Sequence, residues 1–299
     1  MTVDRYFVLG NPVAHSQSPF IHAAFAKQTG QALVYERRLC ALAGFAVAVR
    51  VLAADGGDEA GNAAGAGPVR GCNVTMPFKF EAFALAAQRT PRAARAQAAN
   101  VLRFDADGWL ADNTDGAGLV HDIEGNAGVP IAGRRVLLIG AGGAAAGVLG
   151  PLIACRPALL TVVNRTAANA VALAARHAAW ADQHRVALHT GAMDAATAAV
   201  AAFGGPFDIV INASASSVAG AAVPIGAEVM ATGALVVDLM YGPAAEPFLA
   251  WARGHGATTR DGLGMLVEQA AQAFFLWRGV QPQTAPVLAA LRVHLNAAA

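Results

Sequence analysis

The sequence predicts an α/β protein of two domains, on three observations. Between about residues 136 and 238, short apolar runs alternate with segments of helical pattern, which is typical of a parallel sheet whose strands are joined by helices. The first third of the chain carries an alternation of its own. A length of 299 residues is enough for two substantial hydrophobic cores. The second domain is therefore expected to begin near Val136.

Composition excludes several classes of protein. The chain is 56% hydrophobic and 14% charged, which is too apolar for a disordered segment. Its net charge of +1 offers no concentrated basic charge to a nucleic-acid backbone. The opening MTVDRYFVLG lacks a signal-peptide pattern and the three cysteines are far apart, so reduced thiols and a cytoplasmic location are expected. Neither the cysteines nor the eight histidines show metal-ligand spacing, and no metal site is predicted.

The elements of the first third follow from apolar runs and from the turn residues between them. Ser18 is expected to cap a helix whose first residue is Pro19. The Asp-Ala-Asp-Gly stretch at 105–108 predicts a hairpin, and the Gly/Ala/Asp-rich residues 55–68 predict a loop. The expected strands are 6–9, 33–39, 69–75, 100–104 and 109–111, and the expected helices are 19–27, 42–52, 77–85 and 118–125.

The elements of the remaining chain are predicted in the same way. All-apolar runs of strand length indicate strands buried on both faces, and the Ala-rich segments between them indicate helices. The expected strands are 136–139, 159–163, 186–188, 207–211 and 235–238. The expected helices are the Ala-rich segment after residue 142 and residues 167–178, 192–202, 261–277 and 285–295.

A glycine-rich loop follows the apolar run VLLI and precedes an Ala-rich segment. Its residues, Gly140-Ala-Gly142-Gly143-Ala144-Ala145, match G-x-G-x-x-G/A in the strand-to-helix context of a dinucleotide site. Gly140 allows the sharp turn off the strand, and Gly142 leaves room for a pyrophosphate to approach the backbone. Ala145 allows close packing of the helix, whose N-terminus attracts phosphate. The loop predicts dinucleotide binding, with a simple tight turn as the alternative.

The same stretch also carries a membrane signal, because residues 136–155 contain no charge and include a G-x-x-x-G pattern. Several glycines and the pair Gly150-Pro151 interrupt that segment. No Lys/Arg cluster flanks it and no second apolar span exists. The sequence therefore favours a buried strand and helix over a transmembrane span.

The end of the next predicted strand indicates which dinucleotide binds. An NAD site places an acidic residue there to hold the ribose 2′-hydroxyl. This chain has Asn164-Arg165-Thr166 and no acid at that place. The planar guanidinium of Arg165 suits a 2′-phosphate, so NADP is favoured over NAD.

Four polar residues follow strands or begin helices, where ligands bind in such sheets. Ser16 and Ser18 lie beside a helix N-terminus and would hold a carboxylate, although Ser18 also fits a plain helix cap. Lys79 lies in the first turn of a helix, where a cation is slightly unfavourable, and Asp115 precedes another helix. A solvated lysine and a capping aspartate are the alternatives for those two.

Several motifs together resemble one family. GNPVAHSQSPFIH, NVTMPFK, DNTDG, GAGGA, NRT and DGLGMLVEQA, in this order and spacing, are similar to the shikimate dehydrogenase family, including quinate/shikimate dehydrogenases. The resemblance implies an NADPH-dependent reduction of 3-dehydroshikimate to shikimate in aromatic amino-acid biosynthesis. It implies an N-terminal α/β substrate domain plus a Rossmann NADP-binding domain, with the C-terminal helices returning to the first. The expected boundaries are 1–114 with 256–299, and 115–255.

The resemblance also implies residue roles. Lys79 and Asp115 would form the catalytic pair, in which the ammonium stabilises the developing oxyanion and donates its proton. Ser16 and Ser18 would bind the substrate carboxylate. The other residues that the resemblance places at the substrate are Thr75, Asn100, Tyr241 and Gln269. The residues that it places at the cofactor are Gly140, Gly142, Gly143, Ala144, Asn164, Arg165, Thr166, Met240 and Gly262.

Departures from the family pattern leave alternatives open. Gln97 and Val101 stand where the family usually has Gly and Thr, and Asn169 replaces a second basic residue near the 2′-phosphate. The loop at 212–217 also differs. These changes fit a paralogue that acts on quinate or a related hydroxy acid with relaxed NAD/NADP use. A non-catalytic NADP-binding regulatory protein is the alternative from another class. The expected partner is a small-molecule substrate, with the chain as monomer or homodimer.

Overall fold

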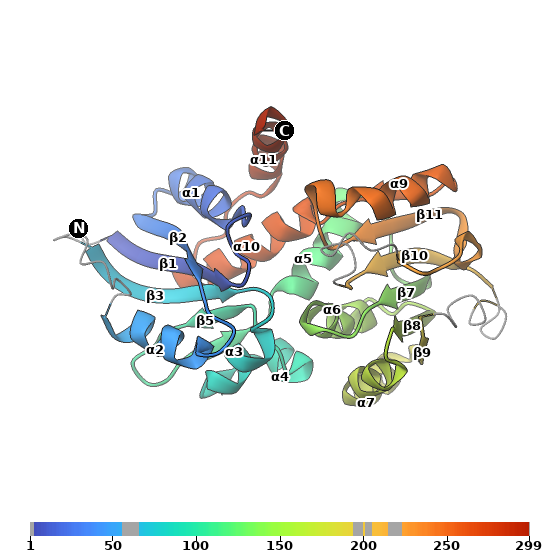
Figure 1. Cartoon of the computed structure of the whole chain (residues 1–299), viewed down its shortest axis with the longest axis horizontal. Helices are drawn as coiled ribbons and strands as arrows, with labels where there is room; N and C mark the ends of the chain where they lie inside the picture. The colour runs from blue at the N-terminus through green and yellow to red at the C-terminus, as the bar shows by residue number, and fades with distance from the viewer. Residues whose placement is uncertain (1–2, 56–65, 194–199, 201–204, 215–222, 299) are drawn as a thin grey trace. The chain divides into compact units, whose positions relative to one another are not determined.

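The computed structural model describes residues 3–55, 66–193, 200, 205–214 and 223–298. The chain divides into two compact units: unit 1 is Met1–Gly118 with Leu266–Ala299, and unit 2 is Leu119–Met265. Each unit contains one six-stranded sheet. Figure 1 shows helices packed against each sheet. The predicted α/β class is confirmed.

Unit 1 has a mixed sheet in the order β2-β1-β3-β5-β6-β4. β1 pairs in parallel with β2 and β3, while β5 is antiparallel to β3 and β6. The antiparallel β5–β6 pair confirms the hairpin predicted around residues 105–108. The strands are β1 (Val3–Gly10), β2 (Leu33–Leu39), β3 (Ala66–Val74), β4 (Gln88–Arg89), β5 (Val101–Arg103) and β6 (Leu110–Asp112).

Both faces of this sheet are covered by packed side chains. The second half of β1 is apolar because its residues are buried on both faces. Phe7 and Leu9 point to the core beneath α2 and α3, whereas Tyr6 and Val8 pack with Trp277 on the opposite face. Figure 1 shows α1 on one side of the sheet and α2 and α3 on the other. The helices of this unit are α1 (Ser18–Thr29), α2 (Phe45–Asp55), α3 (Lys79–Leu85), α4 (Pro91–Ala96), the part of α10 (Leu263–Arg278) from Leu266 onward, and α11 (Ala285–Ala298).

Unit 2 has a wholly parallel sheet in the order β12-β11-β10-β7-β8-β9. Read from the other edge, as β9-β8-β7-β10-β11-β12, and with β7 counted as strand 1, this is the 3-2-1-4-5-6 order of dinucleotide-binding folds. The direction of winding reverses between β7 and β10. The strands are β7 (Arg135–Ile139), β8 (Leu159–Asn164), β9 (Ala187–Ala192), β10 (Phe207–Asn212), β11 (Met230–Asp238) and β12 (Thr258–Arg260).

The helices of unit 2 bury the sheet from both sides. α6 (Gly143–Ala154) and α7 (Ala167–His184) lie on one side in Figure 1, and α9 (Glu246–Gly254) lies on the other. Residues 136–139 are fully buried, as the all-apolar run predicts. α5 (Asp115–His121) enters the unit and continues as a π-helical turn, Asp122–Asn126. None of the described helices is both long and apolar enough to cross a membrane.

Several predicted elements differ from the structure. Ser18 lies inside α1 and Gln17 is its N-cap, so the prediction of Ser18 as a cap is wrong. α5 begins three residues before the predicted start at 118. The predicted helix 192–202 starts wrongly, because Ala192 ends β9; residues 194–199 and 201–202 lie outside the described residues. Residues 56–65 of the predicted loop also lie outside the described residues. The elements β4, α4, α9 and β12 are not among those predicted from the sequence.

Candidate active site

Two of the predicted site residues form an ion pair. Lys79 is the first residue of α3 and Asp115 is the first residue of α5. The Lys79 ammonium lies 2.5 Å from Oδ2 of Asp115, and the two side chains are only 13% and 6% exposed. The alternatives of a solvated lysine and a capping aspartate are therefore wrong for these side chains. A nearly buried ammonium that can donate a proton is a group suited to acid–base chemistry.

The start of α3 is fixed by packing on its N-cap residue. Phe78 is fully buried and its ring stacks on that of Phe45 at 4.6 Å between centroids. The backbone N–H of Phe78 donates to the carbonyl of Thr75, which forms the turn at the end of β3. The Thr75 methyl group occupies the space where a side chain on Gly10 would lie. Thr75 is therefore held beside the β1 exit loop.

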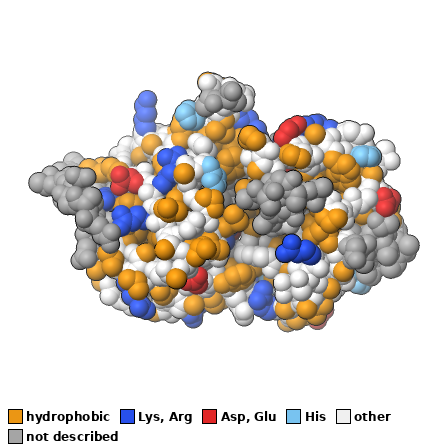
Figure 2. Space-filling model, viewed as in Figure 1, with side chains coloured by type: hydrophobic (Ala, Val, Ile, Leu, Met, Phe, Trp, Pro, Cys, Tyr) orange, Lys and Arg blue, Asp and Glu red, His pale blue; other side chains and the backbone are white. Residues whose placement is uncertain are grey.

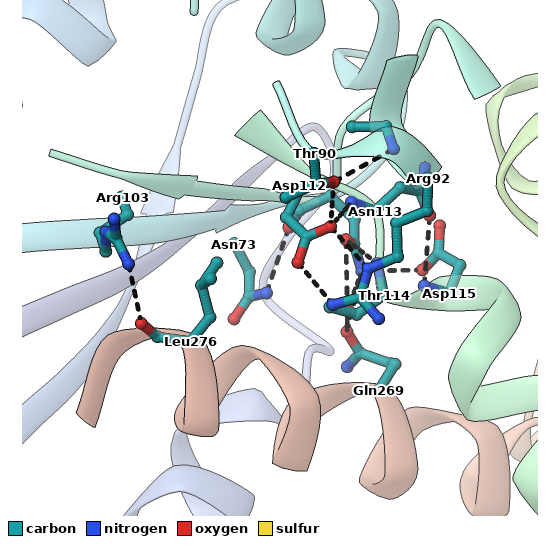
Figure 3. A network of polar contacts seen from close by, with 12 residues as sticks. Asn73, Thr90, Arg92, Arg103, Asp112, Asn113, Thr114, Asp115, Gln269 and Leu276 are labelled. Carbon is teal, nitrogen blue, oxygen red and sulfur yellow. Dashed lines mark hydrogen bonds and ion pairs between the residues drawn. The ribbon is translucent and has the colours of Figure 1, made fainter. Parts of the chain in front are cut away.

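Asn100 connects the ion pair to α10. Its Nδ2 lies within hydrogen-bond distance of Oδ1 of Asp115 (3.0 Å), Oγ1 of Thr114 (2.9 Å) and Oε1 of Gln269 (3.0 Å). Its Oδ1 accepts from the backbone N–H of Thr114 at 2.8 Å. Figure 3 shows Thr114, Asp115 and Gln269 converging on one point. The Thr114 hydroxyl also lies 3.3 Å from Oε1 of Gln269, so the Asn100 amide and the Thr114 hydroxyl together supply the donors of this cluster.

The two predicted serines lie together at the start of α1. Ser16 and Ser18 are 9% and 4% exposed, and the Ser16 hydroxyl donates to that of Ser18 at 3.2 Å. The backbone N–H of Ser18 donates to Ser16 Oγ at 3.3 Å, so Ser16 has a local structural contact as well. Arg37 donates from Nε to the Ser16 carbonyl at 2.8 Å. The guanidinium places positive charge beside the pair of hydroxyls.

Asn73 belongs to the same polar cluster, and sequence reasoning missed it. The Tyr35 hydroxyl donates to Asn73 Oδ1 at 2.6 Å, and Asn73 Nδ2 donates to the Asn100 carbonyl at 3.1 Å. The His22 ring stacks on Tyr35 at 4.2 Å between centroids and 2° between planes. His22 is fully buried, which lowers its pKa to about 3. The available signal for Asn73 is a polar residue between the buried apolar residues Cys72 and Val74 near the end of the strand.

A second ion pair lies under the DNTDG turn. The Asp112 carboxylate is buried and accepts from Arg92 Nε (2.6 Å) and Nη2 (2.5 Å), and from the Thr90 hydroxyl (2.6 Å). Burial alone would raise the pKa of Asp112, but the hydrogen bonds and charge of Arg92, together with Thr90 and the Asn113 N–H, lower it overall. Sequence reasoning singled out neither Arg92 nor Asp112.

In unit 2 the glycine-rich loop has the backbone that its pattern predicts. Gly140 has φ +111°, and a Cβ there would lie 3.0 Å from the backbone of Ala213 and Ser214, at the point where winding reverses. Gly142 is the N-cap of α6, and no described atom lies within 4 Å of where its Cβ would be. Protein packing therefore does not require glycine at 142. The open space lies over the helix N-terminus that Gly143 and Ala144 begin, so these residues fit a bound phosphate.

The end of β8 presents an exposed arginine, Arg165. Asn164 donates from Nδ2 to the Thr166 carbonyl at 2.9 Å, which shapes the turn before α7. Arg165 is exposed and forms no ion pair with any residue that the structure describes. Asn169, one turn into α7, is also exposed. The residues therefore fit an anionic group at this edge, held by one arginine.

Two further predicted cofactor residues lie together after β11. The N–H of Gly262 donates to the Met240 carbonyl at 2.8 Å, and a Cβ on Gly262 would overlap the Leu239 carbonyl. Met240 is itself held by its N–H, which donates to Oδ1 of the buried Asp238 at 2.8 Å. Tyr241 follows and is the N-cap of the 3₁₀ turn Gly242–Ala244. Within the described parts of the chain, no group of three His, Cys, Asp or Glu is placed to hold a metal ion.

Charged side chains are dispersed on the face drawn in Figure 2. Lys and Arg side chains are separated there by hydrophobic and other residues, with Asp and Glu among them. This surface matches the small net charge of +1.

Three family models match successive parts of the chain. "Shikimate dehydrogenase substrate binding domain" matches residues 8–102 and "Shikimate / quinate 5-dehydrogenase" matches residues 124–222. "Shikimate 5'-dehydrogenase C-terminal domain" matches residues 262–292.

Whole-chain similarity agrees with these matches. A protein of Methylibium petroleiphilum named shikimate dehydrogenase (NADP(+)) is 58% identical over 295 residues, which cover 99% of this chain and 96% of the relative. The structure of an Ael1 enzyme from Pseudomonas putida is 40% identical with a TM-score of 0.79, and the match covers 96% and 98% of the two chains. Shikimate 5-dehydrogenase from Thermus thermophilus, in complex with NADP(H) and shikimate, is 28% identical with a TM-score of 0.77, again over 96% and 98%.

Proposed function

The chain belongs to the shikimate dehydrogenase family, and from that premise we propose that it catalyses the reversible, NADP-dependent reduction of 3-dehydroshikimate to shikimate in aromatic amino-acid biosynthesis. The observation that carries this proposal is the buried Lys79–Asp115 pair. NADPH supplies the hydride when bound.

Lys79 performs the proton chemistry in this proposal. Reduction of a ketone builds negative charge on its oxygen, and an ammonium hydrogen-bonded to that oxygen stabilises the charge and donates the proton. In the reverse direction the neutral amine accepts the proton of the alcohol. Asp115 holds the ammonium in place and accepts from a substrate hydroxyl. The low exposure of both side chains supports the proposal, because electrostatic stabilisation is stronger where water is excluded.

The remaining polar residues of unit 1 bind the substrate. Ser16 and Ser18 donate to its carboxylate, with the positive charge of Arg37 beside them. Asn100 and Gln269 contact its hydroxyls, and the hydrogen bonds of Asn100 to Asp115 and Gln269, which gather these polar groups beside the catalytic aspartate, support this role. Thr75 completes the proposed set in unit 1, and Tyr241, which belongs to unit 2, is proposed for the substrate on the family resemblance alone.

The residues of unit 2 hold the cofactor. Gly140, Gly142, Gly143 and Ala144 cradle the pyrophosphate at the N-terminus of α6, which the open space above Gly142 supports. The residues at the end of β8 bind the 2′-phosphate side of the cofactor; they are Asn164, Arg165 and Thr166. The residues after β11 bind its nicotinamide side; they are Met240 and Gly262.

Domain roles, location and assembly remain predictions. We propose a substrate domain of residues 1–114 and 256–299 and a cofactor domain of residues 115–255. The chain is proposed to work in the cytoplasm as a monomer or homodimer. Cys40 and Cys72 are free and buried, and Cys155 is free and partly buried, which agrees with a reducing compartment.

The test is a spectrophotometric assay of purified protein. NADPH formation is followed with shikimate and NADP, and in parallel with quinate and with NAD. Turnover with shikimate and NADP at the highest kcat/KM is expected. A higher kcat/KM with quinate would establish the paralogue that Gln97 and Val101 suggest. No turnover with any of these substrates, combined with NADP binding by calorimetry, would establish the non-catalytic alternative.

A further inference from the structure

The Asp112 carboxylate is an anchor with an unusually complete set of donors. Two nitrogens of Arg92, the Thr90 hydroxyl and the backbone N–H of Asn113 donate to it, at 2.5–2.7 Å. Figure 3 shows the planar guanidinium of Arg92 against both oxygens of the carboxylate. Because both oxygens are engaged by one rigid fork, the carboxylate has one orientation, which a lysine would not impose.

This anchor is connected to the catalytic aspartate through Asn113. The Asn113 N–H donates to Asp112 at 2.7 Å, which fixes the backbone of the turn. The Asn113 side chain then accepts from the N–H of Asp115 at 3.2 Å and donates to the Ala98 carbonyl at 2.9 Å. The position of α5 at its first residue therefore depends on the orientation of the Asp112 carboxylate.

The same segment also contacts the backbone of the catalytic lysine. The N–H of Ala99 donates to the Lys79 carbonyl at 2.8 Å, and the N–H of Asn100 donates to the Asp112 carbonyl at 3.1 Å. Residues 98–100 thus lie between the two catalytic residues and are bonded to the anchored turn.

We propose that Arg92 is a positioning residue: its fork on Asp112 sets the DNTDG turn, and so the separation of Lys79 from Asp115. The inference rests on the proposed catalytic role of that pair. A purely structural ion pair would contribute to folding alone, whereas a positioning residue changes the rate of the folded enzyme. Misplacement of a reacting group by about 1 Å is enough to cost roughly 100-fold in rate.

The central test compares Arg92→Gln and Arg92→Lys with the wild type. Arg92→Gln is expected to lower kcat by about 10- to 100-fold at a temperature where circular dichroism shows it folded. Arg92→Lys keeps the charge but not the fork, and recovers only part of that loss. An unchanged kcat in folded Arg92→Gln, with only a lower Tm, overturns the inference.

A matched control is available in the same unit. Arg103 also meets an aspartate with its guanidinium, since Nε lies 2.9 and 2.8 Å from the two oxygens of Asp105. Its side chain is 35% exposed, close to the 31% of Arg92. Arg103→Gln is expected to leave kcat unchanged. An equal loss of kcat in Arg103→Gln and Arg92→Gln overturns the inference, because any lost ion pair would then have the same effect.

A double-mutant cycle shows whether Arg92 acts through the catalytic pair. In the Lys79→Ala background, Arg92→Gln is expected to cause no further loss of residual kcat, because residues that act as a unit are not additive. Losses that multiply overturn the inference. If Arg92→Gln fails to fold, Thr90→Val replaces it and Thr90→Ser is its control. Thr90→Val is then expected to lower kcat, by less than is expected for Arg92→Gln, while Thr90→Ser keeps the wild-type kcat. Equal kcat in Thr90→Val and Thr90→Ser overturns the inference.

A readout that needs no turnover separates this inference from the proposed function. The Lys79 Nζ resonance, observed by ¹⁵N NMR, reports the surroundings of the ammonium. It is expected to shift in Arg92→Gln and not in Arg103→Gln. If the wild type shows no turnover but the Lys79 resonance shifts in Arg92→Gln, the positioning role stands and the proposed reaction is refuted. If the wild type is active but the resonance does not shift in Arg92→Gln, the proposed reaction stands and the positioning role is refuted.

Discussion

Lys79 and Asp115, which pair through Nζ and Oδ2 at 2.5 Å, are each the first residue of a helix. The positive end of a helix dipole favours the carboxylate at the start of α5 and opposes the ammonium at the start of α3. Asp115 therefore supplies locally the negative charge that Lys79 needs. Without Asp115, the start of α3 would be an unfavourable place for the Lys79 ammonium.

The first prediction concerns Lys79→Ala. Loss of the proton donor is expected to lower kcat by about 10²- to 10⁴-fold, with KM nearly unchanged, because the lost interaction strengthens only as charge develops. Steady-state kinetics with shikimate and NADP measure both constants. Lys27→Ala, at an exposed position of α1, is the control and should retain kcat. A large rise in KM with kcat intact would show that Lys79 only binds the substrate.

The second prediction concerns Arg165→Ala. A charged hydrogen bond contributes roughly 1.5–3 kcal/mol, so the KM for NADP is expected to rise about 10- to 150-fold while the KM for NAD stays the same. Assays with the two cofactors side by side measure the difference. Arg176→Ala, at an exposed position of α7, removes the same charge away from the end of β8 and is the control. Equal loss with both cofactors would refute the 2′-phosphate role.

The third prediction uses the buried His22. Burial lowers its pKa to about 3 from an unfolded value of 6.5, so below pH 6.5 the unfolded chain binds a proton that the folded chain does not. The stability contribution of neutral His22 is complete above pH 6.5 and falls by about 1.4 kcal/mol per pH unit toward pH 3. Urea unfolding at several pH values should show this slope in the wild type and a shallower slope in His22→Phe. Identical slopes would contradict the assignment.

The fourth prediction concerns Gln97, which ends α4 with φ +50°. This left-handed conformation is strained for a residue with a Cβ and free of strain for glycine. Gln97→Gly is expected to raise the free energy of unfolding by roughly 0.5–1 kcal/mol, part of the relief being offset by the entropy of glycine in the unfolded chain. Gln97→Ala keeps the Cβ and should bring no gain. Urea unfolding in which Gln97→Gly is no more stable than Gln97→Ala would disprove the role of strain.

The sequence predicts most of unit 2 because its central strands, β7, β8 and β10, are mostly apolar runs buried on both faces. The run ending at Ile139 and the glycines after it define β7, the turn and α6 without any tertiary information. β4 and β12 are only two and three residues long, so no period can be read in them. They exist because a neighbouring strand pairs with them, as Leu110 does with Gln88.

In unit 1, the catalytic lysine is predictable from the sequence because it is locally out of place. Lys79 is locally unfavourable at a helix start, and that is a signal in the sequence itself. Arg92 lies in a six-residue helix where an arginine is ordinary, and only the fold brings it to Asp112, twenty residues later in the chain. Ser18 fits a helix cap well by sequence, yet the helix begins one residue earlier than that pattern predicts.

Unit 1 is assembled from both ends of the sequence, with unit 2 between them. A ribosome therefore releases all of unit 2 before it releases Gln269, whose Oε1 is the hydrogen-bond acceptor of Asn100 and Thr114. Phe274, whose ring lies against that of Phe25, arrives equally late. Translation that stops before Leu266 leaves a complete parallel sheet beside an unfinished substrate unit. In this protein the parallel sheet is complete during synthesis before the polar cluster around Asn100 can be.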